Sequence, residues 1–239
     1  MLYNDFIYNK PMNYTPEQIS QIVLKVLKEV ETPDFSKLSN EEKIELAKDP
    51  NTSQETLAIL ATDEDWRVRY RVALNQNTSQ ETLKLFATDE DYDVRCCVAR
   101  NPNTSQETLT ILATDEDSNV RYWVAENPNT SQESLAILAT DEYSDVRCGV
   151  AHNQNISQEL LAILATDKHY DVRYRVARNQ NTSQELLAIL ATDEDSYVRW
   201  GVAENPNYKK QTLELNTTQY NALKKLIESG QDEVLKGIL

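Results

Sequence analysis

Cysteine and histidine come closest to a catalytic arrangement at one place in the chain. Cys148 and His152 are four residues apart, so on a helix they share a face and could form a thiolate–imidazole pair. Such a pair also needs an enclosed pocket and donors that stabilise an oxyanion, and this segment supplies neither. The whole sequence contains only two histidines. We therefore expect a protein that is not an enzyme.

Metal and cofactor sites find equally little support. Two ligands do not make a tetrahedral zinc site, and Cys96 lies far from Cys148 in the chain. Acidic strings such as Asp63-Glu64-Asp65 could attract divalent cations loosely, but a calcium site needs six to eight oxygens and usually a glycine-bearing loop. Four glycines in 239 residues also argue against phosphate-binding loops. We expect no metal and no cofactor.

One pair of ionisable residues recurs at fixed spacing, an aspartate followed six residues later by an arginine. A row of such pairs could grip a ligand, or it could join neighbouring repeats through bidentate carboxylate–guanidinium contacts. The second interpretation is favoured, because residues that recognise different parts of a partner have no reason to be identical in six copies. The predicted structural ladder consists of Asp63, Arg69, Asp89, Arg95, Asp115, Arg121, Asp141, Arg147, Asp167, Arg173, Asp193 and Arg199.

These pairs belong to an internal repeat of 26 residues. The string Asn-Thr-Ser-Gln begins at Asn51, Asn77, Asn103, Asn129 and Asn181, and Asn-Ile-Ser-Gln begins at Asn155. A fixed period in this range is typical of a solenoid. The sequence therefore predicts three parts: an N-terminal helical cap with a degenerate half-repeat (1–50), six repeats (51–206) and a C-terminal cap of a short extended segment plus a helix (207–239).

Each repeat reads as two short helices, here called helix A and helix B. Thr52 is expected to cap helix A, with Glu55 completing a capping box, and the acidic corner at 63–65 precedes helix B. Asn75 is expected to end helix B in the left-handed conformation that asparagine tolerates. Helix A is apolar on two faces, Leu57 and Ile59, which predicts that it is sandwiched between neighbouring repeats.

Helix B carries the positions that differ between repeats. Val68, Arg69, Val72 and Ala73 share one half of the helix, which leaves positions 67, 70, 71 and 74 on the other. That half is rich in aromatic residues and arginine, the types enriched at binding hot spots, whereas drift on a solvent face should yield more lysine, glutamate and serine. The candidate partner-binding residues are Arg67, Tyr70, Arg71, Arg100, Tyr122, Trp123, Tyr174, Arg175, Arg178, Tyr197 and Trp200.

The core of each repeat resembles the leucine-rich repeat variant family. The resemblance spans about residues 44–206 and is carried in one copy by Leu109, Leu112, Ala113, Asp115, Val120, Arg121, Val124, Ala125, Asn127 and Pro128. It implies an all-α, right-handed superhelical solenoid of alternating α and 3₁₀ helices, which makes one of the two helices in each repeat a candidate 3₁₀ helix. Some members hold an iron–sulfur centre on an N-terminal cysteine cluster. Residues 1–50 contain no cysteine, so we do not carry that cofactor over.

Charge limits the choice of partner. The formal net charge of −15 should repel nucleic acid and anionic membranes. Three cysteines, with Cys96 and Cys97 adjacent, predict no disulfide framework, and no signal peptide is seen, so a cytoplasmic location is expected. We expect a protein–protein interaction scaffold whose partner and oligomeric state the sequence does not identify. The alternative is a nucleic-acid-related role, either as an acidic phosphate mimic or through the arginine and aromatic face.

Overall fold

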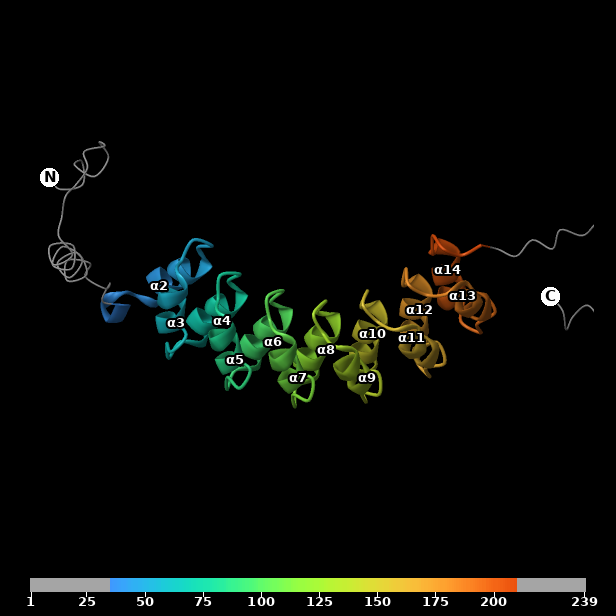
Figure 1. The fold of residues 1–239 in the computed structure, drawn as a ribbon, viewed down its shortest axis with the longest axis horizontal. Coiled ribbons are helices and arrows are strands. Elements are labelled where there is room, and N and C mark those ends of the chain that lie inside the picture. The colour runs from blue at the N-terminus through green and yellow to red at the C-terminus, as the bar shows by residue number, and fades with distance from the viewer. Residues whose placement is uncertain (1–34, 210–239) are drawn as a thin grey trace, which may run out of the picture. The chain divides into compact units, whose positions relative to one another are not determined.

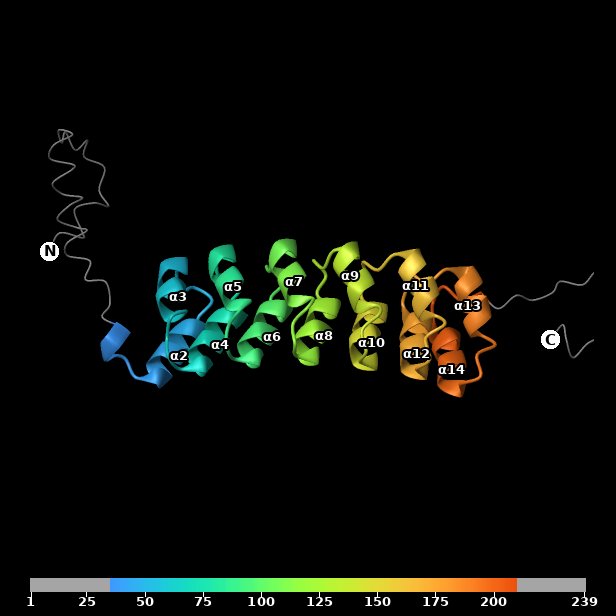
Figure 2. The same cartoon turned by 90° about the horizontal axis from the view of Figure 1, so that it is seen from below.

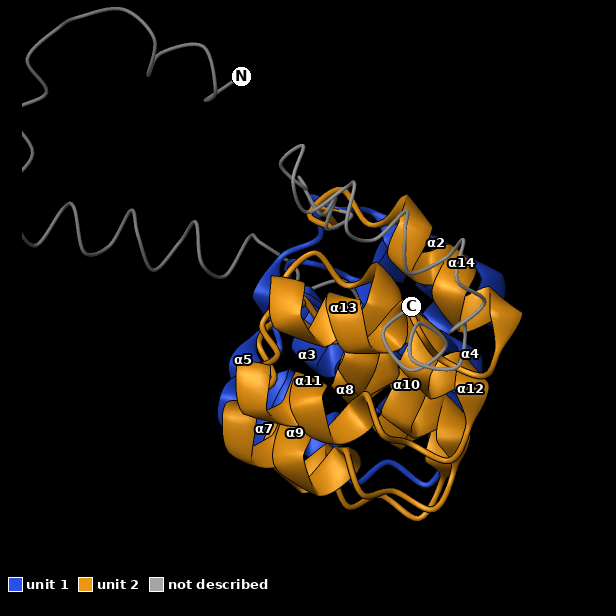
Figure 3. Ribbon diagram, turned by 90° about the vertical axis from the view of Figure 1, so that its right-hand side faces the viewer, with its two compact units in different colours: residues 1–108 blue, residues 109–239 orange. Residues whose placement is uncertain are grey.

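The computed structural model describes residues 35–209 and divides the chain into two compact units, residues 1–108 and residues 109–239 (Figure 3). The predicted N-terminal cap before residue 35 and the predicted C-terminal cap after residue 209 lie outside the described residues. No helix in the described part of the chain is both long enough and apolar enough to cross a membrane.

Both units are built from short helices. The first contains a 3₁₀ helix, η1 (Phe35–Lys37), and α2 (Asn40–Lys48), α3 (Gln54–Leu60), α4 (Trp66–Leu74), α5 (Gln80–Phe86) and α6 (Tyr92–Arg100). Helix α7 (Gln106–Leu112) crosses the division between the units. The second contains α8 (Ser118–Glu126), α9 (Gln132–Leu138), α10 (Ser144–His152), α11 (Gln158–Leu164), α12 (Tyr170–Arg178), α13 (Gln184–Leu190) and α14 (Ser196–Glu204).

Within each unit the helices form two rows, A helices with odd numbers and B helices with even numbers (Figures 1 and 2). In the first unit α2 packs against α4 and α4 against α6, and in the second unit α8 packs against α10, α10 against α12 and α12 against α14. The described residues contain no strand, so the predicted all-α solenoid is confirmed. Both helices of every described repeat are α-helical, so neither is the 3₁₀ helix that the resemblance suggested. Hydrogen bonds of the 3₁₀ type occur at the helix ends, as from the Thr62 N–H to the Ile59 carbonyl (3.2 Å) and from the Asn75 N–H to the Val72 carbonyl (3.0 Å).

The core is a stack of small aliphatic layers, one per repeat. Leu57 and Leu60 from α3 meet Val68 and Val72 from α4, and all four side chains are fully buried. Helices of seven and nine residues are too short to be stable alone in water. Burial against the neighbouring repeat therefore supplies most of their stability.

The caps of the A helices differ from the prediction. Ser53, not Thr52, is the N-cap of α3 and accepts a hydrogen bond from the Thr56 N–H (3.2 Å). Thr52 is buried and its hydroxyl donates to the Leu46 carbonyl at the end of α2 (2.5 Å). The expected Thr52–Glu55 capping box is therefore wrong: the threonine hydroxyl satisfies a carbonyl that the preceding helix leaves unpaired.

The asparagines that end the B helices are not left-handed caps. Asn75 has φ −70° and ψ 128°, an extended conformation, and its buried side chain points back to the preceding repeat. The amide Nδ2 donates to the carbonyls of Ala47 (2.8 Å) and Asp49 (2.9 Å), and Oδ1 accepts from the Asn77 N–H (2.8 Å). Asn101, Asn153, Asn179 and Asn205 repeat this arrangement, which we call the asparagine ladder.

The second apolar face of helix A is also placed differently from the prediction. Leu57 is fully buried, but Ile59 is exposed to solvent, as are its equivalents in the later repeats. The A helices are thus covered on one side only, and the isoleucines form a row on the surface.

Candidate interaction surface

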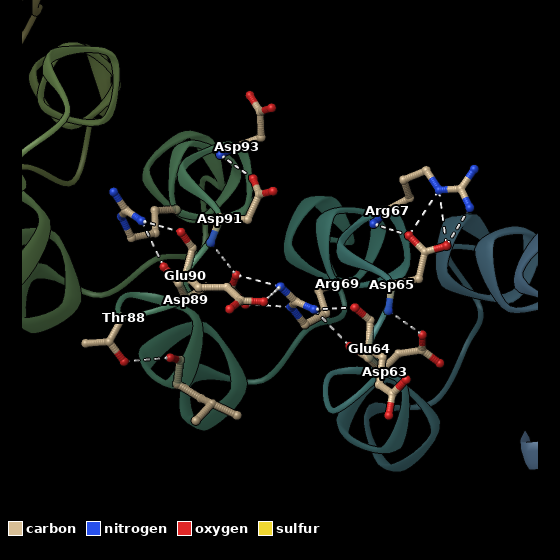
Figure 4. A network of polar contacts seen from close by, with 12 residues as sticks. Asp63, Glu64, Asp65, Arg67, Arg69, Thr88, Asp89, Glu90, Asp91 and Asp93 are labelled. Carbon is tan, nitrogen blue, oxygen red and sulfur yellow. Dashed lines mark hydrogen bonds and ion pairs between the residues drawn. The ribbon is translucent and has the colours of Figure 1, made fainter.

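The recurring aspartates and arginines join one repeat to the next in each unit. In the first unit, Arg69 Nε and Nη2 donate to Asp89 Oδ2 (2.7 Å) and Oδ1 (3.0 Å), a bidentate pair with both side chains buried (Figure 4). Arg69 Nη1 also donates to the carbonyls of Asp63 (3.0 Å) and Glu64 (3.1 Å). Each guanidinium therefore holds its own acidic corner and the aspartate of the following repeat.

The second unit repeats this geometry. Arg121, Arg147 and Arg173 donate through Nε to Asp141 (2.6 Å), Asp167 (2.6 Å) and Asp193 (2.7 Å). At the N-terminal end of the array, Lys43 takes the arginine's place opposite Asp63 (2.7 Å). At the other end, Arg199 hydrogen-bonds the carbonyls of Asp193 (2.6 Å) and Glu194 (2.8 Å) and meets no carboxylate within the described residues. Arg95 donates to the carbonyls of its own acidic corner, Asp89 (2.8 Å) and Glu90 (3.3 Å).

The pairing shifts the acidity of both partners. Burial alone would raise the pKa of Asp167, but hydrogen bonds from Arg147 and from the His169 N–H, with the positive charge of Arg147, hold it below its usual range. The hydrogen bond to Asp167 in turn raises the pKa of Arg147. This matched, buried pair leaves no free charge for a ligand, as expected of a structural ladder.

The variable half of helix B is only partly a solvent surface. At the positions equivalent to Arg71, the even-numbered repeats carry small residues that are buried: Cys97, Gly149 and Gly201. A Cβ added to Gly201 would lie 2.9 Å from a ring carbon of Tyr174, and one added to Gly149 would lie 3.3 Å from a ring carbon of Tyr122. A tyrosine of each odd-numbered repeat thus covers the small residue of the repeat that follows.

This packing accounts for part of the aromatic content that predicted binding. Tyr122 and Tyr174 are half-buried because they lie over glycine, and Tyr70 hydrogen-bonds the buried Cys97 thiol. Trp123 is also half-buried and meets Tyr122 edge to face, with ring centroids 5.0 Å apart. These four predicted binding residues contribute to the contacts between and within repeats.

In the first unit the predicted arginines are largely engaged. Arg67 forms an ion pair with Asp65, its own N-cap (2.6 Å), and Arg71 lies over the ring of Tyr70 at 5.2 Å. Trp66, at a position the sequence analysis did not single out, meets Tyr70 edge to face at 6.1 Å. Arg100, also predicted, is exposed at the end of α6.

Repeats five and six carry five predicted residues on α12 and α14, four of them exposed and Tyr174 half-buried. Tyr174 of α12 stacks on Trp200 of α14, with centroids 6.0 Å apart and planes 7° apart. Arg178 lies beside both rings, at 5.9 Å and 5.8 Å from their centroids. Trp200 is 49% exposed. We call this cluster the aromatic–arginine patch: Tyr174, Arg175, Arg178, Tyr197 and Trp200.

Two further aromatic residues, neither of them predicted from the sequence, extend the patch. Tyr170 lies 6.2 Å from Tyr197, which is 63% exposed, and stacks on His169 at 5.4 Å. His169 and Tyr170 stand at the N-cap and the first residue of α12, where the prediction placed only the acidic corner. The departure of His169 from the aspartate found at position 65 was the signal that could have found them.

The arginines of this patch are not neutralised. Arg175 and Arg178 are exposed, and neither forms an ion pair with any carboxylate in the described part of the chain. A chain with a net charge of −15 thus presents two exposed guanidiniums without a carboxylate partner in the described residues, and one of them, Arg178, lies beside stacked rings. Guanidiniums placed against aromatic faces are well suited to bind carboxylates and planar groups.

The Cys148–His152 pair is not arranged for nucleophilic catalysis. His152 Nδ1 lies 2.8 Å from Glu126 Oε2 of the preceding repeat, so its ring is held by a carboxylate. Burial raises the pKa of the Cys148 thiol to about 12, and that of Cys97 to about 12 as well. Both environments favour the neutral thiol, whereas a nucleophile requires the thiolate. The described residues contain no group of three or more His, Cys, Asp or Glu side chains that could hold a metal ion.

Thiol labelling tests this assignment. At pH 8, a rise of the Cys148 pKa from 9.0 to about 12 lowers its thiolate fraction about 1,000-fold, so alkylation by iodoacetamide should be slow in the folded chain. The measurement is the rate of labelling by mass spectrometry, with the chain unfolded in urea as the control. Rapid labelling of Cys148 in the folded chain would contradict the buried, neutral thiol.

The repeat has relatives among known proteins. A family model described as leucine rich repeat variant matches residues 92–117, a segment of one repeat's length. The repeat is similar to the leucine-rich repeat variant. A solved structure described as a leucine-rich repeat variant with a novel repetitive protein structural motif is 29% identical, covering 72% of this chain and 69% of that chain with a TM-score of 0.56. No curated protein matches the chain at a significant level.

These findings confirm the resemblance drawn from the sequence. The leucine-rich repeat variant is a scaffold of repeats rather than a family defined by an enzymatic activity. The buried layers form the scaffold, so a function of this chain would depend on the exposed side chains that those layers position.

Proposed function

We propose that this chain is a non-enzymatic scaffold that binds a protein partner through the aromatic–arginine patch of repeats five and six. The observation that carries the proposal is the exposed guanidinium of Arg178, which has no carboxylate partner among the described residues and lies beside the stacked rings of Tyr174 and Trp200. Large, rigid aromatic side chains and arginine supply much of the binding energy in protein interfaces. The patch is held on consecutive B helices, so its shape is set before binding.

The charge of the patch selects the partner. Exposed guanidiniums attract carboxylates, and a stacked tryptophan offers an apolar plane, so the partner should present an acidic segment with an aromatic or aliphatic anchor. The remainder of this acidic chain would repel such a partner, which confines binding to the patch. The free thiols of Cys96, Cys97 and Cys148 support a reducing compartment, and we place the function in the cytoplasm.

Affinity capture from the native cell extract at two salt concentrations tests the proposal, with partners identified by mass spectrometry. The test variant combines Tyr197→Ala, Trp200→Ala and Arg178→Ala, since these side chains are exposed and their loss should leave the fold intact. A protein retained by the wild type at high salt should be depleted about tenfold or more by this variant, because loss of a hot-spot residue costs at least that much affinity.

A matched control is Trp66→Ala, which removes an exposed aromatic residue outside the patch and should not change the capture. Equal capture by the patch variant and the wild type would contradict the proposal. Capture of nucleic acid or of DNA-binding proteins, released by salt and indifferent to the patch variant, would instead support a nucleic-acid-related role.

A further inference from the structure

We infer that the row of A helices in the second unit is a second interaction surface, and that it takes a basic amphipathic helix laid across the repeats. The surface, here called the A face, consists of the exposed residues Glu133, Glu159, Glu185, Ile137, Ile163 and Ile189. It lies on A helices, whereas the aromatic–arginine patch lies on B helices, and the inference is independent of the proposed function.

The isoleucines of the A face do not serve the core. Ile137, Ile163 and Ile189 are 52%, 56% and 64% exposed, whereas the leucines that follow them in sequence, such as Leu138 after Ile137, are buried. Helix propensity does not explain them either, since isoleucine is a weaker helix former than alanine, leucine or glutamate. A solvent-exposed branched aliphatic residue at the same place in successive helices marks a surface that another molecule covers.

A comparison of the six repeats indicates that the row of exposed isoleucines is not the result of random sequence drift. The exposed position just before it is Ala58, Lys84 and Thr110 in the first three repeats, so polar residues are tolerated there. The isoleucine position is aliphatic in all six repeats, with Leu85 the one change from isoleucine. Aliphatic character is therefore retained at a solvent position while its neighbour varies.

A second row runs beside the first. Glu133, Glu159 and Glu185 each precede an isoleucine by four residues, so the two share a helix face about 6 Å apart along the axis. These glutamates are exposed, and hydrogen bonds from the helix N-terminus, first from their own backbone N–H and then from the capping serine, lower the pKa of each. The A face thus pairs an apolar stripe with a stripe of fixed negative charge.

The helices that carry these rows are held in register by glutamine clamps. Gln132 Nε2 donates to the Asn155 carbonyl, and Gln132 Oε1 accepts from the Ser157 N–H at the start of the next A helix (3.0 Å). Gln158 donates to the Asn181 carbonyl (2.5 Å), and Gln184 exchanges both hydrogen bonds with Lys209 (3.1 Å and 3.0 Å). Each A helix is therefore fixed against its neighbour, which removes most of the ordering cost of binding.

The spacing of the A helices and the negative charge of the glutamate row indicate which kind of molecule would bind to the A face. Stacked helices lie about 10 Å apart, and seven residues of an α-helix advance about 10.5 Å, so a helix with an aliphatic residue at every seventh position matches the isoleucine row. Lysines or arginines flanking that seam would meet the glutamates. A second copy of this acidic chain, an anionic lipid surface and nucleic acid are all disfavoured, because each would bring negative charge to the glutamate row.

A peptide-binding measurement on the full chain tests the inference. The probe is a synthetic amphipathic helix of about 22 residues with isoleucine at every seventh position and flanking lysines, long enough to cross the row. The matched probe has glutamate in place of each lysine. Fluorescence anisotropy should detect binding of the lysine probe and not of the glutamate probe, with an affinity that falls as salt increases.

Variants of the A face locate the binding. Ile137→Ser, Ile163→Ser and Ile189→Ser, combined, should raise the Kd for the lysine probe about tenfold or more. The matched control, Ala136→Ser, Ala162→Ser and Ala188→Ser, changes the neighbouring positions and should leave the Kd within about twofold of the wild-type value. Glu133→Gln, Glu159→Gln and Glu185→Gln should weaken binding and flatten its salt dependence.

Several results would overturn the inference. The isoleucine variant could bind the lysine probe as tightly as the wild type while keeping its circular dichroism and melting temperature. The binding would then come from diffuse charge attraction and not from the isoleucine row. Ile137→Ala, Ile163→Ala and Ile189→Ala provide a second variant set, because alanine favours the helix, in case the serines disturb folding. Absence of binding by the wild type, equal binding of both probes, or self-association that the isoleucine variant abolishes would each also overturn it.

Discussion

Asn179→Asp should lower the free energy of unfolding by about 3 kcal/mol at neutral pH, although the two side chains have nearly the same shape. Asn179 is 2% exposed, and its Nδ2 donates to the carbonyls of Ala151 (2.8 Å) and Asn153 (3.1 Å). An aspartate would turn an acceptor carboxylate toward these two carbonyls. Two hydrogen bonds are lost, and the buried charge keeps only the Asn181 N–H (2.8 Å in the wild type) as a donor.

The effect should depend on pH in a direction that identifies its cause. Burial and the facing carbonyls disfavour the carboxylate, so the pKa of the introduced carboxyl is raised in the folded state above its ordinary value of about 3.9. The penalty is then absent below that ordinary value and grows as the pH rises through it. Below about pH 4 the protonated carboxyl can donate to one of the two carbonyls, and part of the lost stability returns.

Urea unfolding of the wild type and the variant at several pH values measures this difference. The matched control is Asn181→Asp, the same substitution two residues away, where the exposed side chain donates one hydrogen bond to the Gln154 carbonyl. It should cost less than about 1 kcal/mol. Equal costs for the two variants would mean that the asparagine ladder does not hold the repeats together.

The asparagine ladder also shows which features of the fold cannot be predicted from the sequence. The 26-residue period, the leucine and valine layers and the aspartate–arginine spacing can be read from residue type and position, because each depends on one repeated pattern. The conformation of Asn75 cannot, since an asparagine after a helix is equally compatible with a left-handed cap and with an extended residue. Its extended conformation follows from the two carbonyls that the preceding repeat presents to it.

The N-caps of the A helices could not be predicted from the sequence for a related reason. Thr52 and Ser53 are adjacent hydroxyl residues, and either can cap a helix. The structure places the threonine inward, where its side chain is buried and its hydroxyl pairs with Leu46, and leaves the cap to the serine. The choice depends on a carbonyl from the previous repeat, which local sequence rules do not include.

The candidate interaction surface was only partly predicted, because contacts between neighbouring repeats again decide which side chains are exposed. Residue types alone place Tyr122 and Tyr174 on a binding face, but both lie over glycines of the next repeat. The pattern behind this contact is visible in the sequence. A tyrosine in each odd-numbered repeat is followed 27 residues later by a small residue, Cys97, Gly149 or Gly201. Comparing successive repeats, rather than aligning all six to one pattern, would have indicated this contact.

Asp167→Asn should lower the free energy of unfolding at pH 7 by about 3 kcal/mol, because removing one partner of a buried ion pair leaves the other uncompensated. Arg147 and Asp167 are 6% and 9% exposed and share two hydrogen bonds, Nε to Oδ2 (2.6 Å) and Nη2 to Oδ1 (2.9 Å). An asparagine keeps the shape of the aspartate but loses its charge and one of its acceptors. Urea unfolding of the full chain measures the difference.

The pH dependence of this variant follows from the lowered pKa of Asp167 in the folded wild type. A carboxyl with a depressed folded pKa contributes stability that is fully present above its unfolded pKa, about 3.9, and is lost as the pH falls through the folded pKa. Asp141 and Asp193 share the direction of this shift. The wild type should therefore lose stability steeply below about pH 4, and the gap to Asp167→Asn should close there.

A double variant separates the charge from the packing. Arg147→Met with Asp167→Leu replaces the buried pair by apolar side chains, and such replacements are often neutral or stabilising, whereas Arg147→Met alone leaves a buried carboxylate unpaired. The double variant should therefore be more stable than either single variant, Arg147→Met or Asp167→Asn, by about 2 kcal/mol or more. If it were instead as unstable as the sum of the single changes, the Arg147 contacts to the Asp141 and Glu142 carbonyls (2.7 Å and 3.1 Å), rather than its pairing with Asp167, would hold the repeats in place.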